Sequence, residues 1–411
     1  MSPRDIVQEE ETPSGLAAPP RRVPKTWLLT LLMGLGPFSM QILIPSLPLL
    51  AGIFAVPYTT VQMSLTIYLI GIALGQLIYG PLSDRYGRRP VLLGGLAIYL
   101  LGSLAALLAP SIGLLIVARA AQAAGGCAGM VLVRAIIRDV FPRDQAASKI
   151  GFVMMGMTVA PMMAPLLGAE LTAAFGWRST MLACVGFGIL LGLLALRLPE
   201  TLPAAQPLPG LRGMGHAFVQ LAAIRSFRCY AAITTCTTGL FFAFMAGAPR
   251  VLMEGMGHTP RAYALSFMAI SLAFGAGSYL AGRFSSRLGL ARMLRLGLIV
   301  STGGALLAVL AQALLPLSIV IFFIPMSVVA LGNGVSQPNA VAAAVSVRPQ
   351  LAGTASGLVG ALQMAFGAVM TMVASAVELG SGIGTAATMA GCAIGAQLAW
   401  RGARRSRDQD E

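Results

Sequence analysis

The chain has 411 residues, of which 57% are hydrophobic and only 10% are charged. Soluble domains carry about 25% charged residues, so this composition excludes an ordinary soluble enzyme or binding module and indicates a membrane protein in contact with the lipid bilayer. The net charge of +14 is spread over alternate turns between apolar segments, which indicates membrane topology rather than binding of nucleic acid. The five cysteines have no metal-ligand spacing, so we expect no disulfide, no metal site and no cofactor.

Residues 1–25 are polar and interrupted by proline, and they predict a disordered cytoplasmic tail rather than a cleaved signal peptide. Twelve apolar segments follow, each long enough to cross a bilayer as a helix. The first six are 27–50, 58–79, 91–109, 112–137, 146–171 and 180–198. The second six are 229–249, 262–282, 293–315, 317–337, 351–377 and 383–400. The predicted fold class is therefore an all-α membrane protein with twelve transmembrane helices.

The placement of Lys and Arg predicts the orientation of these helices. On the side opposite to the N-terminus, the connecting loops carry only Arg178, Arg250 and Arg261. Cytoplasmic loops are enriched in Lys and Arg, so both termini are predicted to be cytoplasmic. Residues 199–228, which contain several prolines, predict a cytoplasmic linker between two six-helix halves, 26–198 and 229–400. Residues 401–411 predict a second cytoplasmic tail.

The two halves repeat one another in sequence. A shift of 202 residues matches the turn after the second apolar segment to the turn after the eighth. The matched pairs are Gly80 and Gly282, Ser83 and Ser285, Arg85 and Arg287, and Gly87 and Gly289. Asp84 becomes Ser286, so the second copy lacks the acid. The pattern predicts two copies of one six-helix unit.

Residues 80–90, Gly-Pro-Leu-Ser-Asp-Arg-Tyr-Gly-Arg-Arg-Pro, join the second and third apolar segments. So short a connection predicts an antiparallel pair of helices with a tight turn, in which Gly80 permits a close helix contact and Gly87 a left-handed backbone. A charged stop between two membrane helices would explain the arginines. It would not explain the glycines and the acid at these positions.

The pattern G-x-x-x-D-R-x-G-R-R resembles the loop signature of the major facilitator superfamily of transporters. The resemblance implies two six-helix halves with a substrate site between them near the midplane, and transport by alternating access. It also implies a gating relay of charges that holds the two halves together on the cytoplasmic side. The residues that match this relay are Asp84, Arg85, Arg88 and Asp139.

Other segments resemble one branch of this superfamily, the bicyclomycin/chloramphenicol-resistance (Bcr/CflA) drug transporters. They include Ile-Pro-Ser-Leu-Pro at 44–48, Arg119-x-x-Gln122 and Phe-Gly-Trp-Arg at 175–178. Residues 164–169 resemble the G-P-x-x-G-G signature of drug antiporters, with alanine in place of two glycines. The resemblance implies a multidrug efflux transporter of the bacterial inner membrane, coupled to protons and acting on a small-molecule substrate. We expect it to be a monomer.

Small residues at four-residue spacing are typical of close contacts between membrane helices. Gly71 and Gly75 form such a pair in the second segment, and Gly353 and Gly357 in the eleventh. In the superfamily these two helices touch across the interface of the halves. The resemblance therefore implies that both glycine pairs lie in that interface.

Arg119 lies about eight residues into the fourth segment, where a cation costs roughly 2.5–3.5 kcal/mol on insertion scales. Such a residue faces a water-filled cavity or a partner, and Gln122 shares its helix face. The functional interpretation is a polar stripe on the substrate cavity; the alternative is a structural arginine that binds backbone carbonyls at a kink. Further candidates for the cavity lining are Gln41, Asn333, Gln337, Gln363 and Phe242. A buried amide can equally hold two helices together, and phenylalanine more commonly faces lipid.

Members of the branch carry an aspartate in the first segment, where this chain has Gln41, which cannot ionise. None of the other acids is predicted at the midplane, so a lipophilic cation would meet Arg119 without a deep carboxylate. Neutral or weakly anionic amphiphiles are therefore the predicted substrates. If protons are coupled, the predicted carriers lie near the rim of the spans, Glu170 first and then Glu378.

Enzyme chemistry has no support in the sequence, which lacks G-x-S-x-G and H-E-x-x-H patterns and a nucleotide-binding loop. The chain is therefore not predicted to be an enzyme. Two other functions stay open, a sugar or metabolite facilitator not coupled to protons and a non-transporting membrane scaffold or sensor. The intact turn with Asp84 favours a transporter, because a scaffold does not need a gate.

Overall fold

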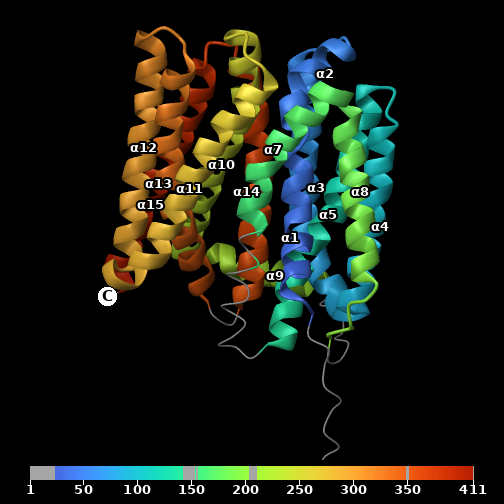
Figure 1. Ribbon diagram of the computed structural model, residues 1–411. Helices are drawn as coiled ribbons and strands as arrows, with labels where there is room; N and C mark the ends of the chain where they lie inside the picture. Colours follow the sequence, from blue (N-terminus) through green and yellow to red (C-terminus); the bar gives the residue numbers. More distant parts are fainter. Residues whose placement is uncertain (1–23, 142–152, 154–155, 203–210, 349–350, 411) are drawn as a thin grey trace, which may run out of the picture.

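The computed structural model describes residues 24–141, 153, 156–202, 211–348 and 351–410. Every regular element among them is a helix, and the helices form two bundles side by side (Figure 1). The first half contains α1 (Thr26–Gln41), the 3-10 turn η1 (Ile44–Ser46), α2 (Leu47–Ile53), α3 (Tyr58–Tyr86), α4 (Arg88–Leu107), α5 (Ile112–Val140), α7 (Gly156–Phe175) and α8 (Arg178–Ala195). The remaining elements are α9 (Leu211–Ala223), α10 (Arg225–Arg250), the π-helix η2 (Val251–Gly255), α11 (Pro260–Leu288), α12 (Leu290–Leu314), α13 (Ile319–Ser346), α14 (Ala352–Val377) and α15 (Ile383–Asp410).

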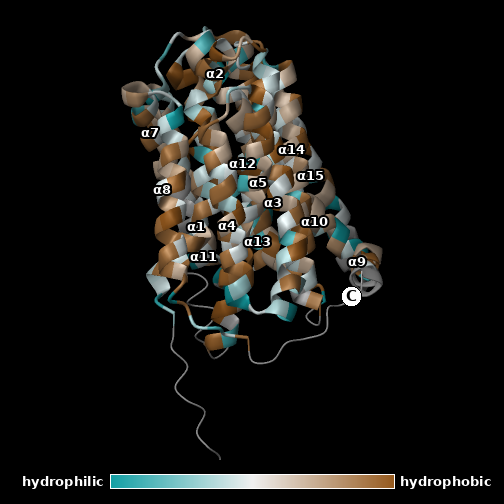
Figure 2. Cartoon of the chain, turned by 90° about the vertical axis from the view of Figure 1, so that its right-hand side faces the viewer, coloured by the Kyte–Doolittle hydropathy of each residue, from teal (hydrophilic) through white to brown (hydrophobic). Residues whose placement is uncertain are grey.

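The molecule has two ends that differ in what they carry. We call one the α2 end, because α2 lies there; the other, the α9 end, carries α9, the start of α1 and the end of α15 (Figure 1). Hydrophobic residues cover the helices between the two ends (Figure 2). Large apolar side chains such as Leu101, Val320 and Leu398 are exposed there. A surface of this kind requires an apolar solvent, which a lipid bilayer provides.

Ten helical segments in the described part of the chain are long and apolar enough to cross a membrane. They correspond to all the predicted spans except 146–171 and 383–400. The span 146–171 lies partly outside the described residues, and its described part belongs to α7, whose apolar stretch Met162–Phe175 is shorter. The span 383–400 forms the first part of α15, where the polar Gln397 lowers the hydropathy.

The first predicted span, 27–50, is broken in its middle. α1 ends at Gln41, and η1 then connects it to α2. Pro45 and Pro48 explain the break, because each lacks the N–H group that a continuous helix would donate to the carbonyl four residues earlier. The break leaves the carbonyls of Ser39 and Met40 in the last turn of α1 inside the bundle without helical partners.

The turn predicted at residues 80–90 is shorter than expected. α3 continues through Pro81 to Tyr86 and α4 begins at Arg88, so only Gly87 lies between the two helices. Gly87 has a φ of +97°, which confirms the predicted left-handed residue. The close contact predicted at Gly80 was wrong, since a Cβ atom there would meet no atom within 4 Å outside its own helix.

The predicted linker 199–228 is partly helical. Residues 203–210 lie outside the described part of the chain, but α9 follows them and α10 already begins at Arg225. Leu221 of α9 is completely buried, in a hydrophobic cluster with Phe227 and Val359. α9 therefore packs on the second half. The predicted C-terminal tail is also largely helical, because α15 continues to Asp410.

The two halves share a turn and a close helix contact. Gly289, 202 residues after Gly87, has a φ of +83° and separates α11 from α12 as Gly87 separates α3 from α4. The same shift relates Gly95 of α4 to Gly297 of α12. A Cβ atom on Gly95 would approach α5 to 2.4 Å, and one on Gly297 would approach α13 to 2.6 Å. The sequence repeat is thus also a structural repeat at these positions.

The prediction for the glycine pairs at the interface of the halves holds only in part, because Gly357 of α14 does face α3, where a Cβ atom would lie 3.9 Å from the Gln76 carbonyl. α3 and α14 do pack together, with Gln76 of α3 against Gly360 of α14. Gly71 and Gly75, however, face α5 of their own half, where they lie against Ala123 and Cys127. These two glycines therefore allow close packing inside the first half, and another face of α3 contacts α14.

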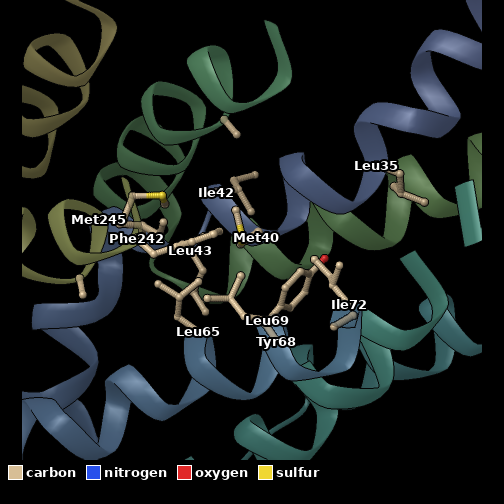
Figure 3. Packing of buried hydrophobic residues seen from close by; sticks show 14 of the residues in the cluster. Leu35, Met40, Ile42, Leu43, Leu65, Tyr68, Leu69, Ile72, Phe242 and Met245 are labelled. Carbon is tan, nitrogen blue, oxygen red and sulfur yellow. The ribbon is translucent and has the colours of Figure 1, made fainter. Parts of the chain in front are cut away.

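The halves share one hydrophobic cluster, to which both contribute buried residues. Figure 3 shows part of it, with Phe242 and Met245 of α10 beside Leu43 and Leu65 of the first half. A second cluster draws its residues only from α9 and the second half, and it lies at the α9 end. The apolar core common to the halves therefore does not include this end of the second half.

Polar contacts also join the halves. The Tyr58 hydroxyl at the start of α3 donates to the carbonyl of Ala246 in α10 (2.9 Å). The hydroxyls of Thr66 in α3 and Thr371 in α14 are hydrogen-bonded at 2.8 Å. The Tyr58 bond lies at the α2 end, so both apolar and polar contacts hold the two halves together there.

Candidate functional site

Arg88 at the start of α4 binds both predicted relay acids. Its Nε donates to Asp139 of α5 (2.9 Å), and its Nη1 donates to Asp84 and Ser83 of α3. The Arg88 side chain is 8% exposed, against 45% for Asp84 and 16% for Asp139. Arg85 is exposed and forms no ion pair within the described part of the chain. The cluster ties α3, α4 and α5 of the first half together, and its contact with the second half stays a prediction.

Glu200, shortly after α8, caps the same turn. Its carboxylate accepts the N–H groups of Arg88 (2.9 Å) and Arg89 (3.1 Å), the first residues of α4, and those of Thr201 and Leu202 (both 2.9 Å). Burial alone would raise the pKa of Glu200, but the four backbone donors outweigh it and the pKa is lowered. The carboxylate also suits the positive end of the helix dipole. Sequence reasoning missed this contact, because Glu200 lies 112 residues from Arg88.

Arg119 lies in α5 and is 1% exposed. Its Nη1 donates to the carbonyl of Ser39 (2.8 Å) and to Oε1 of Gln122, and its Nη2 donates to the carbonyl of Met40 (3.5 Å). The guanidinium also lies over the ring of Tyr68, 4.1 Å from the centroid, which is a cation–π contact. Among the described residues, no carboxylate pairs with Arg119.

These bonds support the alternative interpretation of Arg119, a structural arginine that binds backbone carbonyls. Ser39 and Met40 belong to the last turn of α1, which is the negative end of the helix dipole, and their carbonyls lack helical partners. Gln122 extends the network, because its Nε2 donates to Ser103 of α4 (2.8 Å). Arg119 and Gln122 thus hold α1, α4 and α5 together. Their role in lining the substrate cavity stays a prediction.

The second half carries a polar cluster around a run of threonines in α10. Three predicted amides donate to this run, namely Asn333 to Thr237 O (3.0 Å), Gln337 to Thr238 Oγ1 (3.0 Å) and Gln363 to Thr234 O (3.5 Å). Asn333 is buried and its Oδ1 has no hydrogen-bond partner, whereas Gln337 and Gln363 are half-buried. Sequence reasoning missed the threonines, although four of them in residues 234–238 of an apolar span are a visible signal.

Gln41 is the last residue of α1 and is completely buried, and neither of its amide atoms has a hydrogen-bond partner. Gln62 of α3, which sequence reasoning did not select, has the same property. A buried polar group without partners costs about 1–3 kcal/mol, so both amides are candidates for contact with a ligand. Phe242 is buried as well and packs against Gly367 of α14, so it does not face lipid.

The two predicted proton carriers have different surroundings. Glu170 of α7 is half-exposed and forms an ion pair of 2.9 Å with Arg261 of α11, which joins the halves at the α2 end. Glu378 is completely buried, and its carboxylate accepts four hydrogen bonds of 2.7–2.9 Å from residues 380–385. These bonds cap the first turn of α15. The carrier role of both residues stays a prediction.

Comparison with known proteins gives a consistent group of relatives. The family model described as Major Facilitator Superfamily matches residues 29–372. Multidrug resistance protein D of Escherichia coli is 30% identical over 91% of this chain and 94% of its own. Chloramphenicol resistance protein of Pseudomonas aeruginosa is 31% identical over 77% of this chain and 73% of its own. A bicyclomycin resistance protein homolog of Haemophilus influenzae is 28% identical over 90% of this chain and 94% of its own.

Solved structures agree on the fold. A bacterial homolog of the human lysosomal transporter Spinster, in an inward-facing and unoccupied conformation, superimposes with a TM-score of 0.73. The superposition covers 92% of this chain and 96% of that one at 16% sequence identity. At this identity the likeness concerns the fold alone.

Proposed function

The chain belongs to the Major Facilitator Superfamily, within the branch of its bicyclomycin- and chloramphenicol-resistance relatives. We propose that it exports small neutral or weakly anionic amphiphiles by alternating access and proton antiport. The protein is a multi-pass transporter of the bacterial inner membrane for small molecules, and not an enzyme. Its relatives are named for drug resistance, which supports drug efflux as the general activity.

The proposed topology has twelve crossings, in which α7 and α15 supply the two that the ten apolar segments leave out. The α9 end lies in the cytoplasm and the α2 end in the periplasm. The support is the cluster of arginines at the Gly87 turn, because cytoplasmic loops are enriched in Arg and Lys. A single chain supplies both halves around the site, so we propose that the monomer is the working unit.

The charge of the buried polar groups carries the proposal for the substrate. In the described spans Arg119 is a fully buried cation, paired with carbonyls and an aromatic ring rather than with a carboxylate. Among the described residues the one fully buried carboxylate, that of Glu378, is occupied as a helix cap near the α2 end. A lipophilic cation would therefore be repelled in a low dielectric without a compensating acid.

A neutral substrate with amide or hydroxyl groups suits the polar groups without partners. Gln41 offers a donor and an acceptor, and Asn333 offers its Oδ1 as an acceptor. Half-buried Gln337 and Gln363 extend this set on the side of the second half. Together with Arg119 and Gln122 they form the proposed substrate cavity, and Phe242 supplies an apolar wall.

Gating and proton coupling are proposed for the charged residues at the two ends. The gate on the cytoplasmic side consists of Asp84, Arg85, Arg88 and Asp139. Glu170 is the first choice for the proton carrier, because it is accessible and its ion pair with Arg261 joins the halves. Protonation of Glu170 would remove that attraction and favour opening of the α2 end. Glu378 is the second choice for the proton carrier, because its capping hydrogen bonds would have to break before its carboxylate could take up a proton.

The test is transport by the purified protein in liposomes with an imposed pH gradient, comparing chloramphenicol with ethidium. We expect the gradient to drive chloramphenicol transport and to move ethidium little. Robust ethidium transport would contradict the proposal for the substrate. Chloramphenicol transport that does not depend on the pH gradient would favour a facilitator that is not coupled to protons. Coupling that survives Glu170→Gln together with Glu378→Gln would exclude both carriers.

Arg119→Ala should abolish transport per folded molecule if Arg119 lines the cavity, and Gln122→Ala should shift the preference among substrates. Arg295→Gln is the control, because Arg295 is an exposed arginine of α12. If Arg119→Ala lowers only the yield of protein and leaves transport per molecule intact, Arg119 is structural.

A further inference from the structure

A groove with a volume of about 490 Å³ opens between α9, α10 and α14. Phe218 and Ala222 line it from α9, and Leu358 and Leu362 from α14. Only Arg228 and Thr235 of α10 bring polar side chains to the lining. The groove lies at the α9 end, because its walls come from the first turns of α10 and α14.

The groove opens on the surface that faces lipid. Leu362, Val369 and Val373 of α14 are exposed by 41%, 51% and 39%, and their spacing of seven and four residues places them on one helix face. Leu362 of this stripe also lines the groove. On the other side, Val219 of α9 lines the groove and is 67% exposed. An acyl chain from the surrounding bilayer could therefore enter the groove without crossing protein.

The mouth of the groove is basic. Arg228 is exposed, and its Nη1 donates to the carbonyls of Ala222 (3.0 Å) and Ala223 (3.4 Å) at the end of α9. A guanidinium has five N–H donors, so these bonds use only part of its capacity. The sequence has no Asp or Glu between Glu200 and Glu254, so no acid of this segment offsets the charge.

We propose that this groove binds one anionic phospholipid of the cytoplasmic leaflet, with an acyl chain between α9 and α14 and the phosphate at Arg228. The proposal rests on the orientation proposed above, which places the α9 end at that leaflet. Basic residues at the cytoplasmic membrane surface attract anionic lipids, and the apolar walls would bury the chain. The bound lipid would hold α9, and with it the linker between the halves, against the second half.

The experiment uses the full chain in detergent and counts bound lipids by native mass spectrometry. The probes are phosphatidylglycerol and phosphatidylcholine with identical acyl chains. We expect wild type to bind phosphatidylglycerol more tightly. Arg228→Gln should weaken that binding about fivefold, as expected for one basic residue at the membrane surface, and leave phosphatidylcholine unchanged. Arg295→Gln, which alters an exposed arginine away from the groove, should behave as wild type.

A second pair of variants tests the groove independently of charge. Ala222 and Ala223 are both exposed neighbours at the end of α9, but only Ala222 lines the groove. Ala222→Trp should fill the groove and weaken binding of both lipids, whereas Ala223→Trp should not. Thermal unfolding of each variant checks that the fold is kept.

Three results would overturn the proposal. The first is equal binding of the two lipids by wild type. The second is unchanged binding of phosphatidylglycerol in Ala222→Trp. The third is that Ala222→Trp abolishes binding of chloramphenicol, or association of two copies of the chain, while binding of phosphatidylglycerol persists, because the groove would then belong to another occupant.

Discussion

Arg88 lies between two acids of unequal exposure, Asp139 at 16% and Asp84 at 45%. Attraction between opposite charges grows as water is excluded, so the bond to Asp139 should contribute more to stability. The pair with Asp84 falls in the range of exposed ion pairs, about 0–1 kcal/mol. Such a small energy can still bias two conformations of nearly equal free energy. We therefore expect the two acids to have separable effects.

Asp84→Asn should lower transport strongly and change the unfolding temperature little. Asp139→Asn should lower transport and also reduce the free energy of unfolding by about 1–3 kcal/mol, because buried Arg88 loses a partner. Efflux of chloramphenicol from cells without their own pumps and thermal unfolding in detergent measure the two effects. Arg295→Gln is the control, since Arg295 is an exposed arginine of α12 outside the predicted relay. Normal efflux by the Asp84→Asn protein would contradict its gating role.

Glu200 makes the stability of the Gly87 turn depend on pH. Its pKa is lowered in the folded protein, so its contribution to stability is present above the pKa of the unfolded chain and is lost as pH falls through the folded value. We expect Glu200→Gln to lower the unfolding temperature at neutral pH. The difference from wild type should narrow as the pH is lowered from about 5 to about 3. A constant difference over this range would mean that the charge of Glu200 does not strengthen its bonds.

Among the elements, the two matched turns differ in one respect. Gly87 and Gly289 both have positive φ with extended ψ, a region that is almost restricted to glycine. A Cβ atom on Gly87 would lie 2.6 Å from Oε2 of Glu200, whereas one on Gly289 would meet nothing within 4 Å. The first turn therefore carries a carboxylate cap that the second turn lacks.

Gly87→Ala and Gly289→Ala form a matched pair of variants. Each should cost about 1–3 kcal/mol of stability through backbone strain. Gly87→Ala should cost more, because the added methyl group also displaces Glu200 from the start of α4, and it should reduce transport more strongly. Thermal unfolding and chloramphenicol efflux measure the difference. Equal losses in both variants would indicate that the Glu200 cap contributes nothing.

Ten of the predicted spans correspond to apolar helices of the described chain, but the ends of these helices differ from the sequence-based bounds for a physical reason. Hydropathy marks where a helix meets the edge of the bilayer, whereas a helix ends where the backbone is capped. α3 therefore continues through Ser83 and Asp84 until Gly87 turns the chain. α15 likewise continues into its charged last turns. α9 was not predicted, because its short amphipathic pattern was assigned to the linker.

The site was predictable where side chains pair through a known motif, as for Arg88 with Asp84 and Asp139. Where the partner is a backbone group, the sequence predicted at most the kind of bond, as in the structural alternative for Arg119, and not the residues that supply the partner. The carbonyls of Ser39 and Met40 that hold Arg119 are available because α1 ends at Gln41, inside the first predicted span. The N–H groups that hold Glu200 belong to a helix more than a hundred residues earlier.

At the scale of the whole molecule, two polar side-chain contacts between the halves, those of Tyr58 and of Glu170, lie at the α2 end. Tyr58 crosses to the carbonyl of Ala246 there, and Arg250 of the second half lies 5.5 Å from the Tyr58 ring. Tyr263 in α11 is also completely buried, but its hydroxyl has no hydrogen-bond partner. The two tyrosines therefore offer a matched comparison, because only one of them bonds across the interface.

Tyr58→Phe should weaken closure of the α2 end by about 0.5–1.5 kcal/mol, the net value of one hydrogen bond. Amide hydrogen exchange at residues 246–255 should then rise by a factor of about 2–10. Tyr263→Phe should leave exchange unchanged, since it removes no bond. Equal exchange in the two variants would contradict a role for the Tyr58 bond in closure.

The shared hydrophobic cluster has a consequence for the rate of the transport cycle. To open the α2 end, the protein must separate Phe242 and Met245 from the first half and break the bonds of Tyr58 and Glu170 before any new contact compensates. The α9 end of the second half keeps its own apolar cluster in either state. We therefore expect the opening that releases the substrate to have the higher activation barrier, so that turnover is set by this motion rather than by binding.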